Sequence, residues 1–379
     1  MRNNPRPHDR RWLTRARLPI QVLLSLLLAV TVAAQGRPAE PSVRGEGTLR
    51  AMTYNMYVGS EYAGVTNPNL PVFLQAVTNM FLEASASDPA GRVQIIARQI
   101  AATMPHLVSL QEVATWSKGP TKDNLAVQFD YLQLLLDALA AQGVQYTLVV
   151  SNETWSVTVP SSMGLYVRTS WGVAILARAD LKPEHFSFTN VHAATWSALS
   201  TLNVPLPALN GNAADCPVAL TSSGACVMPM PRGWAYTDVT YRGKQVRFIS
   251  AHLESGSASR NIRQGNELLN GPANTALPVI VAGDLNCDLS NPSDPKYPTC
   301  IGFINAGFVD SWSAANPFEP GNTRNVPNVT IRSDYIFVRG PFTAQTALLV
   351  GEEPGDKTAS GLYASDHSGV VAKLEPPEQ

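Results

Sequence analysis

The chain reads VIVAGDLN from Val279 to Asn286. An apolar run rich in β-branched residues that passes at once into Gly, Asp and Asn is typical of a buried strand ending at a polar loop. Three other stretches share this design: AMTYN at 51–55, LVSLQE at 107–112 and FISAH at 248–252. Polar side chains at the ends of buried strands gather at one edge of a sheet, the usual place for chemistry in α/β proteins. The sequence therefore predicts a polar site on a rigid, strand-built scaffold.

Around these stretches, strand-like runs alternate with helical ones. The spacing of apolar residues predicts helices over 70–82, 91–104, 124–141 and 260–269. Strands are predicted over 49–54, 107–110, 146–150, 172–177, 234–241, 245–251, 278–282, 332–338 and 369–374. This alternation predicts an α/β fold with the strands on the inside. Residues 193–233, rich in Pro, Ala, Asn and Ser, are predicted to form a long functional or rim loop.

The composition limits the class of protein. The 379 residues are 45% hydrophobic and 15% charged, which provides apolar material for one large domain or two ordinary ones. Lys and Arg number 28 against 29 Asp and Glu, so the formal net charge is −1 and a strongly cationic binding protein is excluded. The 29 prolines indicate many rigid loops between short elements.

Residues 1–34 have the pattern of a secretory signal peptide. A segment rich in arginine precedes an uncharged apolar run, and small residues at 32–34 suit cleavage. An uncleaved membrane anchor is the alternative, but it needs about 20 apolar residues, whereas this run is shorter and contains Pro19. We predict a cleaved signal peptide at 1–34, a linker at 35–47 and a secreted or periplasmic protein. Removing 1–34 would change the net charge from −1 to about −6.

Export changes the interpretation of the four cysteines. Thiols outside the cytoplasm tend to pair, and their spacing here is not that of a zinc site. Proximity in the sequence favours Cys216 with Cys226 and Cys287 with Cys300, although four cysteines allow three connectivities. These two pairs would close two small loops.

The polar residues of the strand ends suit one kind of chemistry. They comprise four carboxylates, two amides and two imidazoles: Glu112, Asp284, Asp334, Asp366, Asn55, Asn286, His252 and His367. Carboxylate and amide oxygens favour a hard divalent cation such as Mg²⁺, Mn²⁺ or Ca²⁺. Such a cation, a His–Asp pair that activates water and a further acid are what phosphoester hydrolysis requires. Singly, each residue could be a turn or core residue, but their joint occurrence favours a site.

The order and spacing of these motifs resemble the endonuclease/exonuclease/phosphatase superfamily. The resemblance covers residues 48–374 and rests on Asn55 and on LQE at 110–112, SAHLE at 250–254, GDLN at 283–286, RSDY at 332–335 and SDH at 365–367. It implies one domain over 48–375 with a four-layer α/β sandwich, two mixed β-sheets face to face with helices outside. It also implies a divalent-metal-dependent phosphoesterase that cleaves P–O bonds by in-line attack of water, without a covalent intermediate.

The resemblance implies a metal site and a partner. Glu112 is expected to be the principal ligand of the cation, Mg²⁺ or alternatively Mn²⁺ or Ca²⁺, with Asn55 and Asp366 as ligands or close neighbours. The expected partner is a phosphodiester substrate, either nucleic acid or a phospholipid head group. We expect a monomer with no obligate protein partner.

The resemblance also implies the catalytic residues. His367, held by Asp334, is expected to act as the general base or to polarise the phosphate, following the His–Asp logic of catalytic triads. Asp284 and Asn286 are expected to position the attacking water and stabilise the pentacoordinate phosphorus. His252 is expected to bind the phosphate or to protonate the leaving oxygen.

Three hypotheses on the substrate follow. A nuclease is slightly favoured by the catalytic set, although an acidic mature chain supplies no general field for phosphates. Export and the apolar loop at 155–167 suit a sphingomyelinase, a phospholipase C-like enzyme or an inositol-phosphate phosphatase. A catalytically inactive binding module is the third. In nuclease-like members a polar or carboxylate residue supports the histidine matching His252, whereas TSWGV stands at 169–173 here. Either His252 is supported from elsewhere, with Glu254 as a candidate, or the leaving-group chemistry differs.

Overall fold

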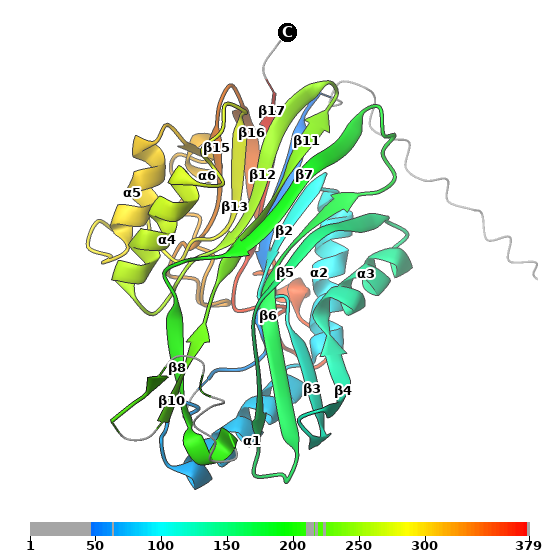
Figure 1. The fold of residues 1–379 in the computed structure, drawn as a ribbon. Helices are drawn as coiled ribbons and strands as arrows, with labels where there is room; N and C mark the ends of the chain where they lie inside the picture. The colour runs from blue at the N-terminus through cyan, green and yellow to red at the C-terminus, as the bar shows by residue number, and fades with distance from the viewer. Residues whose placement is uncertain (1–46, 63, 210–215, 217–218, 223–224, 377–379) are drawn as a thin grey trace, which may run out of the picture. The chain divides into compact units, whose positions relative to one another are not determined.

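The computed structural model describes residues 47–62, 64–209, 216, 219–222 and 225–376 (Figure 1). The chain divides into two units, residues 1–45 and 46–379, and the second unit holds every element named below. The predicted signal peptide, and the predicted linker apart from Gly47, lie outside the described residues. Within the described ranges, no helix has both the length and the apolar character needed to cross a membrane.

Two large mixed sheets form the centre of the second unit. The first has the order β16-β17-β1-β2-β6-β3-β4, with β5 paired to β6. Within it β1 and β2 are parallel, and β17 runs antiparallel to β1. Its strands are β1 (Leu49–Asn55), β2 (Leu107–Gln111), β3 (Thr115–Thr121), β4 (Asn124–Asp130), β5 (Tyr146–Pro160), β6 (Tyr166–Arg178), β16 (Thr343–Val350) and β17 (Gly369–Glu375).

The second sheet has the order β14-β15-β13-β12-β11-β7. The central strands β12 and β13 are parallel, and β15 runs antiparallel to β13. Its strands are β7 (Phe186–Thr195), β11 (Gly233–Tyr241), β12 (Lys244–His252), β13 (Val279–Asp284), β14 (Val309–Asp310) and β15 (Asp334–Arg339). In each sheet, therefore, a parallel pair of strands ends where an antiparallel neighbour begins. The pair β1 and β2 ends beside the start of β17, and the pair β12 and β13 ends beside the start of β15.

Alternation along the strands makes the sheets face each other. Leu49 and Ala51 of β1 and Ile280 and Ala282 of β13 belong to one buried cluster shared by the two sheets. The residues between them point to the opposite faces, because successive side chains of a strand alternate. This shared cluster is the core between the two sheets.

Helices cover the two outer faces (Figure 1). Met52 and Tyr54 of β1 pack in a cluster with α1 (Leu70–Ala86), α2 (Pro89–Thr103) and α3 (Tyr131–Ala141). Val279 and Val281 of β13 pack in another with α4 (Ala258–Asn270) and α5 (Tyr297–Asn305), and the short α6 (Ser311–Ala315) lies against β15 and β16. The predicted four-layer α/β sandwich is confirmed.

Capping side chains set where the helices begin. Asn69, Asp88 and Asp130 accept hydrogen bonds from the first turns of α1, α2 and α3, which satisfies donors that a helix leaves unpaired. The cap at Asp130 corrects the predicted helix over 124–141. Its first seven residues form β4, paired antiparallel with β3, and the helix starts only at Tyr131. Leu125 and Phe129 of β4 are four residues apart, so they imitate the spacing of a helix that continues into α3.

The stretch 193–233 is also corrected. Where it is described, it contains a small three-stranded sheet of β8 (Ser200–Pro205), β10 (Ala225–Met230) and β9 (Ala219–Leu220), with the single-turn helix η1 (Leu206–Leu209). Both predicted disulfides form: Cys216–Cys226 involves β10 of this sheet, and Cys287–Cys300 joins the loop after β13 to α5 within the buried core. Pairing between β8 and β10 replaces the predicted loop.

Candidate active site

Strand alternation brings the predicted site residues to the space between the sheets. Asn55 lies four residues beyond the inward Ala51 of β1, and Asp284 lies two residues beyond the inward Ala282 of β13, so both continue the inner face at the strand ends. His252 at the end of β12 pairs with Asp284, and Asp284 pairs with Asp334 at the start of the antiparallel β15. Three neighbouring strands therefore present His252, Asp284 and Asp334 side by side.

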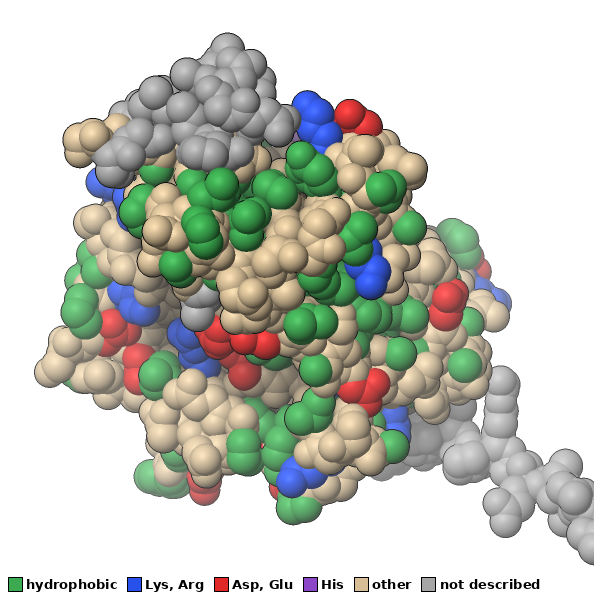
Figure 2. All heavy atoms as spheres, turned by 90° about the horizontal axis from the view of Figure 1, so that it is seen from below, with side chains coloured by type: hydrophobic (Ala, Val, Ile, Leu, Met, Phe, Trp, Pro, Cys, Tyr) green, Lys and Arg blue, Asp and Glu red, His purple; other side chains and the backbone are tan. Residues whose placement is uncertain are grey.

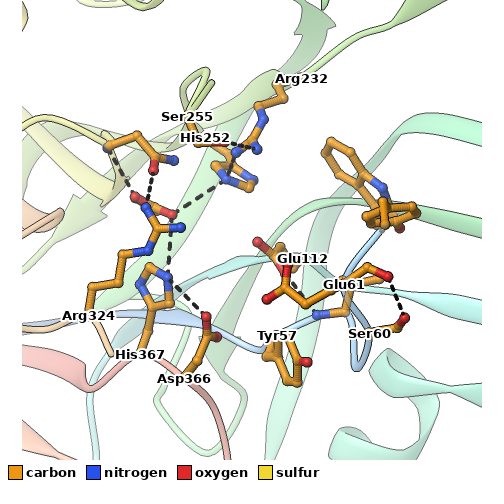
Figure 3. A pocket seen from close by; sticks show the side chains of 15 residues that line it. Tyr57, Ser60, Glu61, Glu112, Arg232, His252, Ser255, Arg324, Asp366 and His367 are labelled. Carbon is orange, nitrogen blue, oxygen red and sulfur yellow. Dashed lines mark hydrogen bonds and ion pairs between the residues drawn. The ribbon is translucent and has the colours of Figure 1, made fainter. Parts of the chain in front are cut away.

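A cavity of about 170 Å³ opens at this edge of the sheets (Figure 3). Six of the predicted residues line it: Glu112, His252, Asp284, Asn286, Asp366 and His367. The other two, Asn55 and Asp334, lie buried behind the lining and contact it. Figure 2 shows the hollowed face, where acidic and basic side chains lie together among mostly hydrophobic and uncharged ones. The structure thus brings all the predicted residues into one site.

Glu112 is fixed by two hydrogen bonds. The Asn55 amide donates to Glu112 Oε1 at 3.1 Å and to Asp284 Oδ2 at 3.2 Å, and the Val58 N–H donates to Glu112 Oε2 at 2.8 Å. Glu112 has a φ of 52°, in the left-handed region that few non-glycine residues occupy. Such backbone strain clusters at functional sites. Asn55 therefore ties the carboxylates of the two sheets together.

His367 and Asp334 form a buried pair. His367 Nδ1 donates to Asp334 Oδ2 at 2.8 Å, and the hydroxyls of Thr323 and Ser333 donate to the same oxygen at 2.6 and 2.9 Å. Burial lowers the pKa of His367, but the negative charges of Asp334 and Asp284 outweigh it and raise that pKa to about 10. His367 therefore carries its proton at neutral pH.

The surroundings of Asp284 disfavour its ionised form. Burial and the neighbouring charge of Asp334 raise the pKa of Asp284 to about 6, against the opposing effect of His367, Arg324 and Arg232. Ligand atoms of Asp284, Asp334 and His367 lie within 4.8 Å of one another, as in a metal site. Asp334 Oδ1 is buried and has no hydrogen-bond partner among the described residues.

His252 is supported by an arginine. Arg232, just after β10, contacts His252 Nε2 and donates to the Leu253 carbonyl at 3.0 Å and to Ser255 Oγ at 2.9 Å (Figure 3). Its guanidinium lies 5.5 Å from the centre of the Trp171 ring. Burial and the Arg232 charge hold the pKa of His252 well below its usual range, so this imidazole is neutral.

The predicted support by Glu254 is wrong. Its carboxylate accepts from the Ser200 hydroxyl and from the Gly256 N–H, the latter at 2.7 Å, and so it holds β8 and the loop after β12. His252 Nδ1 is buried and has no hydrogen-bond partner in the part of the chain that the structure describes. The small sheet, through Arg232, takes the supporting position beside His252.

Two arginines of the site, Arg232 and Arg324, belong to no motif in the sequence and were not predicted as site residues. Arg232 lies in the stretch predicted as a functional loop, which was the only signal for it. Arg324 donates to Asn286 Oδ1 at 3.2 Å, and its backbone forms an isolated β-bridge with His367. Among the described residues neither guanidinium forms an ion pair with a carboxylate. Both line the cavity, so they supply positive charge for an anionic ligand.

The sequence matches a family model over the same region. The model is that of the Endonuclease/Exonuclease/phosphatase family, and the match covers residues 52–367. The chain belongs to this family. It is accordingly an enzyme that hydrolyses phosphoester bonds. The matched range includes every predicted site residue. A comparison with curated protein sequences gives no match.

Solved structures share the fold of this family member. An endonuclease/exonuclease/phosphatase from Beutenbergia cavernae is 19% identical with a TM-score of 0.54, covering 87% of this chain and 72% of its own. The mannosyl-6-phosphatase of Bacteroides thetaiotaomicron is 16% identical with a TM-score of 0.51, covering 86% and 99%. A family protein from Leptotrichia buccalis is 18% identical with a TM-score of 0.50, covering 86% and 99%. At such identities the likeness concerns the fold.

Proposed function

We propose that this protein is an exported phosphoesterase that depends on a divalent cation and cleaves P–O bonds by in-line attack of water. The observation that carries the proposal is the meeting, in one cavity, of the His367–Asp334 pair, the carboxylates Asp284 and Glu112, and two arginines that form no ion pair with a carboxylate of the described residues. Acid–base groups and anion-binding cations in one hollow are the parts that phosphoester hydrolysis needs.

The residues present fit a hard cation. The available ligand atoms are carboxylate and amide oxygens, which a hard cation prefers. The two carboxylates of Asp284 and Asp334 are buried close together, and the pKa of Asp284 is raised for that reason. We propose that Glu112 holds the ion with Asn55 and Asp366 beside it, and that Mg²⁺ is the natural choice among Mg²⁺, Mn²⁺ and Ca²⁺. When bound, the ion would neutralise charge on the phosphate oxygens.

The pKa directions assign the acid–base roles. Because the pKa of His367 is raised to about 10, the protonated imidazole donates a hydrogen bond to a phosphate oxygen rather than removing a proton. Asp284, with a pKa of about 6, is mostly ionised at neutral pH and is the base that orients the attacking water, together with Asn286. Asp284 Oδ2 lies 4.0 Å from His367 Nε2, so water and phosphate would sit close to both.

Arg232 changes the expected role of His252. A neutral imidazole whose Nε2 faces a guanidinium is poorly placed to protonate the leaving oxygen. We propose that Arg232 provides the positive charge on this side of the cavity and that Arg324 provides it on the side of Asn286. The two arginines would stabilise the charge that builds up on the phosphate during water attack.

Export and substrate are further parts of the proposal. Two disulfides support an oxidising compartment, as the predicted signal peptide does. A nuclease remains a prediction, favoured by the catalytic set, but the surroundings of the hollow in Figure 2 are mostly uncharged. The mannosyl-6-phosphatase of similar fold supports the alternative of a small phosphate ester.

The experiment that tests the proposal is a hydrolysis panel with purified mature protein. Plasmid DNA, sphingomyelin, inositol phosphates, a sugar phosphate and bis-p-nitrophenyl phosphate are each assayed with Mg²⁺ and with a chelator. We expect turnover of at least one phosphoester, lost with the chelator and in Glu112→Ala and Asp284→Ala. Turnover that survives the chelator and both substitutions, or no turnover of any substrate, would overturn it.

A further inference from the structure

A buried arginine lies behind the end of β1. Arg92, in the first turn of α2, is 2% exposed and forms no ion pair among the described residues. Burial of an unpaired charge costs folding free energy, and the dipole of a helix disfavours a cation at its N-terminal end. An apolar side chain of similar size would avoid both costs, so the reason for a cation lies in the groups that it contacts.

Those groups are main-chain carbonyls of two loops of the site. The Arg92 guanidinium donates hydrogen bonds of 3.1 to 3.3 Å to the carbonyls of Met56, Tyr57 and Ala364. Met56 and Tyr57 come directly after β1, and Ala364 comes directly before the SDH motif at 365–367. One side chain therefore joins the loop that follows β1 to the loop that leads into β17.

Two of these carbonyls belong to peptides whose N–H groups bind predicted metal ligands. The Met56 carbonyl and the Tyr57 N–H share one peptide, and this N–H donates to Asn55 Oδ1 at 2.9 Å. The Tyr57 carbonyl and the Val58 N–H share the next peptide, and this N–H donates to Glu112 Oε2 at 2.8 Å. The carbonyl and the N–H of a trans peptide point in opposite directions, so a group that fixes the carbonyl also aims the N–H. A cation at the carbonyl also polarises the peptide, which strengthens its N–H as a donor.

The alignment of these two peptides depends on an unusual backbone conformation. Tyr57, which joins them and lines the cavity (Figure 3), has a φ of 57°, in the left-handed region that few non-glycine residues occupy. Such a conformation persists only where its surroundings enforce it. The surroundings here are the Arg92 guanidinium and the Tyr131 hydroxyl, which accepts from Arg92 at 3.0 Å and donates to the Val58 carbonyl at 3.1 Å.

We propose that Arg92 is a positioning residue that orients the Asn55 amide and the Glu112 carboxylate through the peptides on either side of Tyr57. The proposal rests on the proposed function, in which Glu112 and Asn55 hold the divalent cation. Arg92 is not one of the described residues that line the cavity, so it acts on the reaction only through these groups. Residues that orient the ligands of a metal ion commonly set its affinity. Loss of the guanidinium should therefore weaken metal binding more than substrate binding.

Metal binding tests the positioning role directly. Mn²⁺, which takes the same oxygen ligands as Mg²⁺, is titrated into the metal-free protein, and the free ion is measured by electron paramagnetic resonance. We expect Arg92→Met to bind Mn²⁺ about tenfold or more weakly than wild type. In hydrolysis assays it should need about tenfold more Mg²⁺ for half-maximal rate, whereas the KM for substrate at saturating Mg²⁺ should stay close to that of wild type.

A milder variant keeps the test valid if Arg92→Met does not fold. Arg92→Lys retains the positive charge, but a single ammonium lacks the planar fork that serves several carbonyls at once. We expect it to fold and to show the same changes to a smaller extent.

The Val58 amide reports the positioning without metal or turnover. Its proton resonance, in the metal-free, isotope-labelled protein, should lie downfield because the N–H donates to a carboxylate. We expect this resonance to move upfield in Arg92→Met and in Arg92→Lys. Glu112→Ala, which removes the acceptor, gives the reference position for the lost hydrogen bond.

Arg339→Met is the matched control. The Arg339 guanidinium donates to the carbonyls of Ala273 and Thr275 at 2.6 and 3.1 Å and lies 4.9 Å from the centre of the Phe308 ring. Arg339 is the last residue of β15, at the opposite end of that strand from the site. Its replacement should lower the melting temperature, as that of Arg92 does, but leave Mn²⁺ binding and the Val58 resonance unchanged.

The outcomes separate this proposal from the proposed function. An unmoved Val58 resonance in both Arg92 variants would overturn the positioning role, and so would unchanged affinity of both for Mn²⁺. Equal effects of Arg339→Met would also overturn it, because they would reflect a general loss of stability. If wild type itself binds no Mn²⁺, the proposed metal site fails, and the Val58 resonance still decides whether Arg92 positions Glu112.

Discussion

His367 Nδ1 lies 2.8 Å from Asp334 Oδ2, although the two residues stand 33 positions apart in the chain. The pair forms because Asp334 is the first residue of β15 and His367 lies two residues before β17, and both strands begin at the same edge of the sheets. The hydroxyls of Thr323 and Ser333 also donate to Asp334 Oδ2. A histidine oriented and charged by a buried carboxylate is a recurrent catalytic arrangement. Its contribution here can be measured directly.

Replacing Asp334 should impair catalysis more than folding. In Asp334→Asn the carboxylate charge that raises the pKa of His367 is lost, so the imidazole is no longer held protonated. We expect kcat to fall by about 100-fold or more, measured on the best substrate of the hydrolysis panel. Thr323→Val, which removes one hydrogen bond to the same oxygen, should cost about tenfold. Equal kcat in wild type and Asp334→Asn would contradict a catalytic His367.

Removing the Glu112 carboxylate should abolish the response to metal. Glu112→Gln keeps the size of the side chain and can still accept from Asn55 or Val58, but it loses the negative charge. We expect turnover to drop by about 100-fold, and Mg²⁺ to raise the melting temperature of wild type but not of the variant. The exposed Glu319→Gln serves as the control. A Mg²⁺-induced shift retained in Glu112→Gln would place the ion elsewhere, for example at Asp284, Asp334 and His367.

The geometry of the Arg232 guanidinium should matter for activity in addition to its positive charge. Its guanidinium serves His252, the Leu253 carbonyl and Ser255 at once, which a lysine ammonium cannot do with the same geometry. We expect Arg232→Lys to lower kcat/KM by about tenfold or more, with a melting temperature close to that of wild type. Arg98→Lys, at an exposed site on α2, is the matched substitution and should leave kcat/KM unchanged. If both variants behave alike, Arg232 has no special part in the reaction.

The buried His106 should make the stability of the folded protein depend on pH. Burial, with the charges of Arg178 and Arg50, lowers the pKa of His106 to about 3, and its Nδ1 accepts from the Arg50 N–H at 2.9 Å. A depressed pKa in the folded state means that stability is full above the unfolded pKa of 6.5 and is lost as pH falls toward 3. At pH 5 this loss amounts to about 2 kcal/mol.

A variant that cannot titrate isolates this effect. His106→Asn retains an acceptor but takes up no proton, so its free energy of unfolding should fall less between pH 7 and pH 5 than that of wild type, as measured by urea denaturation. His185→Asn, a substitution of an exposed histidine, should reproduce the wild-type decline. Parallel curves for His106→Asn and wild type would show that His106 does not govern acid sensitivity.

The two disulfides should have different effects when removed. Cys287 and Cys300 are 1% and 0% exposed and belong to the core beneath α4 and α5. We expect Cys287→Ser/Cys300→Ser to lose about 3 kcal/mol of unfolding free energy. Cys216→Ser/Cys226→Ser alters the small sheet that leads to Arg232, so its main effect should be on kcat/KM. Equal losses of stability in both double variants would argue against this division.

Much of the fold could be predicted from the sequence because local patterns of residues determine its strands and helices. An apolar run followed at once by a polar side chain predicts a buried strand end wherever it stands, and β1, β2, β12 and β13 all have this pattern. The prediction over 124–141 was wrong because β4 and α3 adjoin without a break, and only the pairing of β4 with β3 shows where one ends. The small sheet of β8, β9 and β10 was missed for the same reason, since its strands are defined by partners.

The sequence by itself determined the inner layers and the polar residues at their ends. Alternation along a strand fixes which side chains face the other sheet, so Asp284 and Asp334 had to point inward once their strands were buried. Tertiary structure alone decided what surrounds them. Arg232 reaches His252 from the short link between β10 and β11, and Tyr62 and Trp171 come together from different segments. Such contacts depend on the packing of distant segments, and no local pattern of residues encodes them.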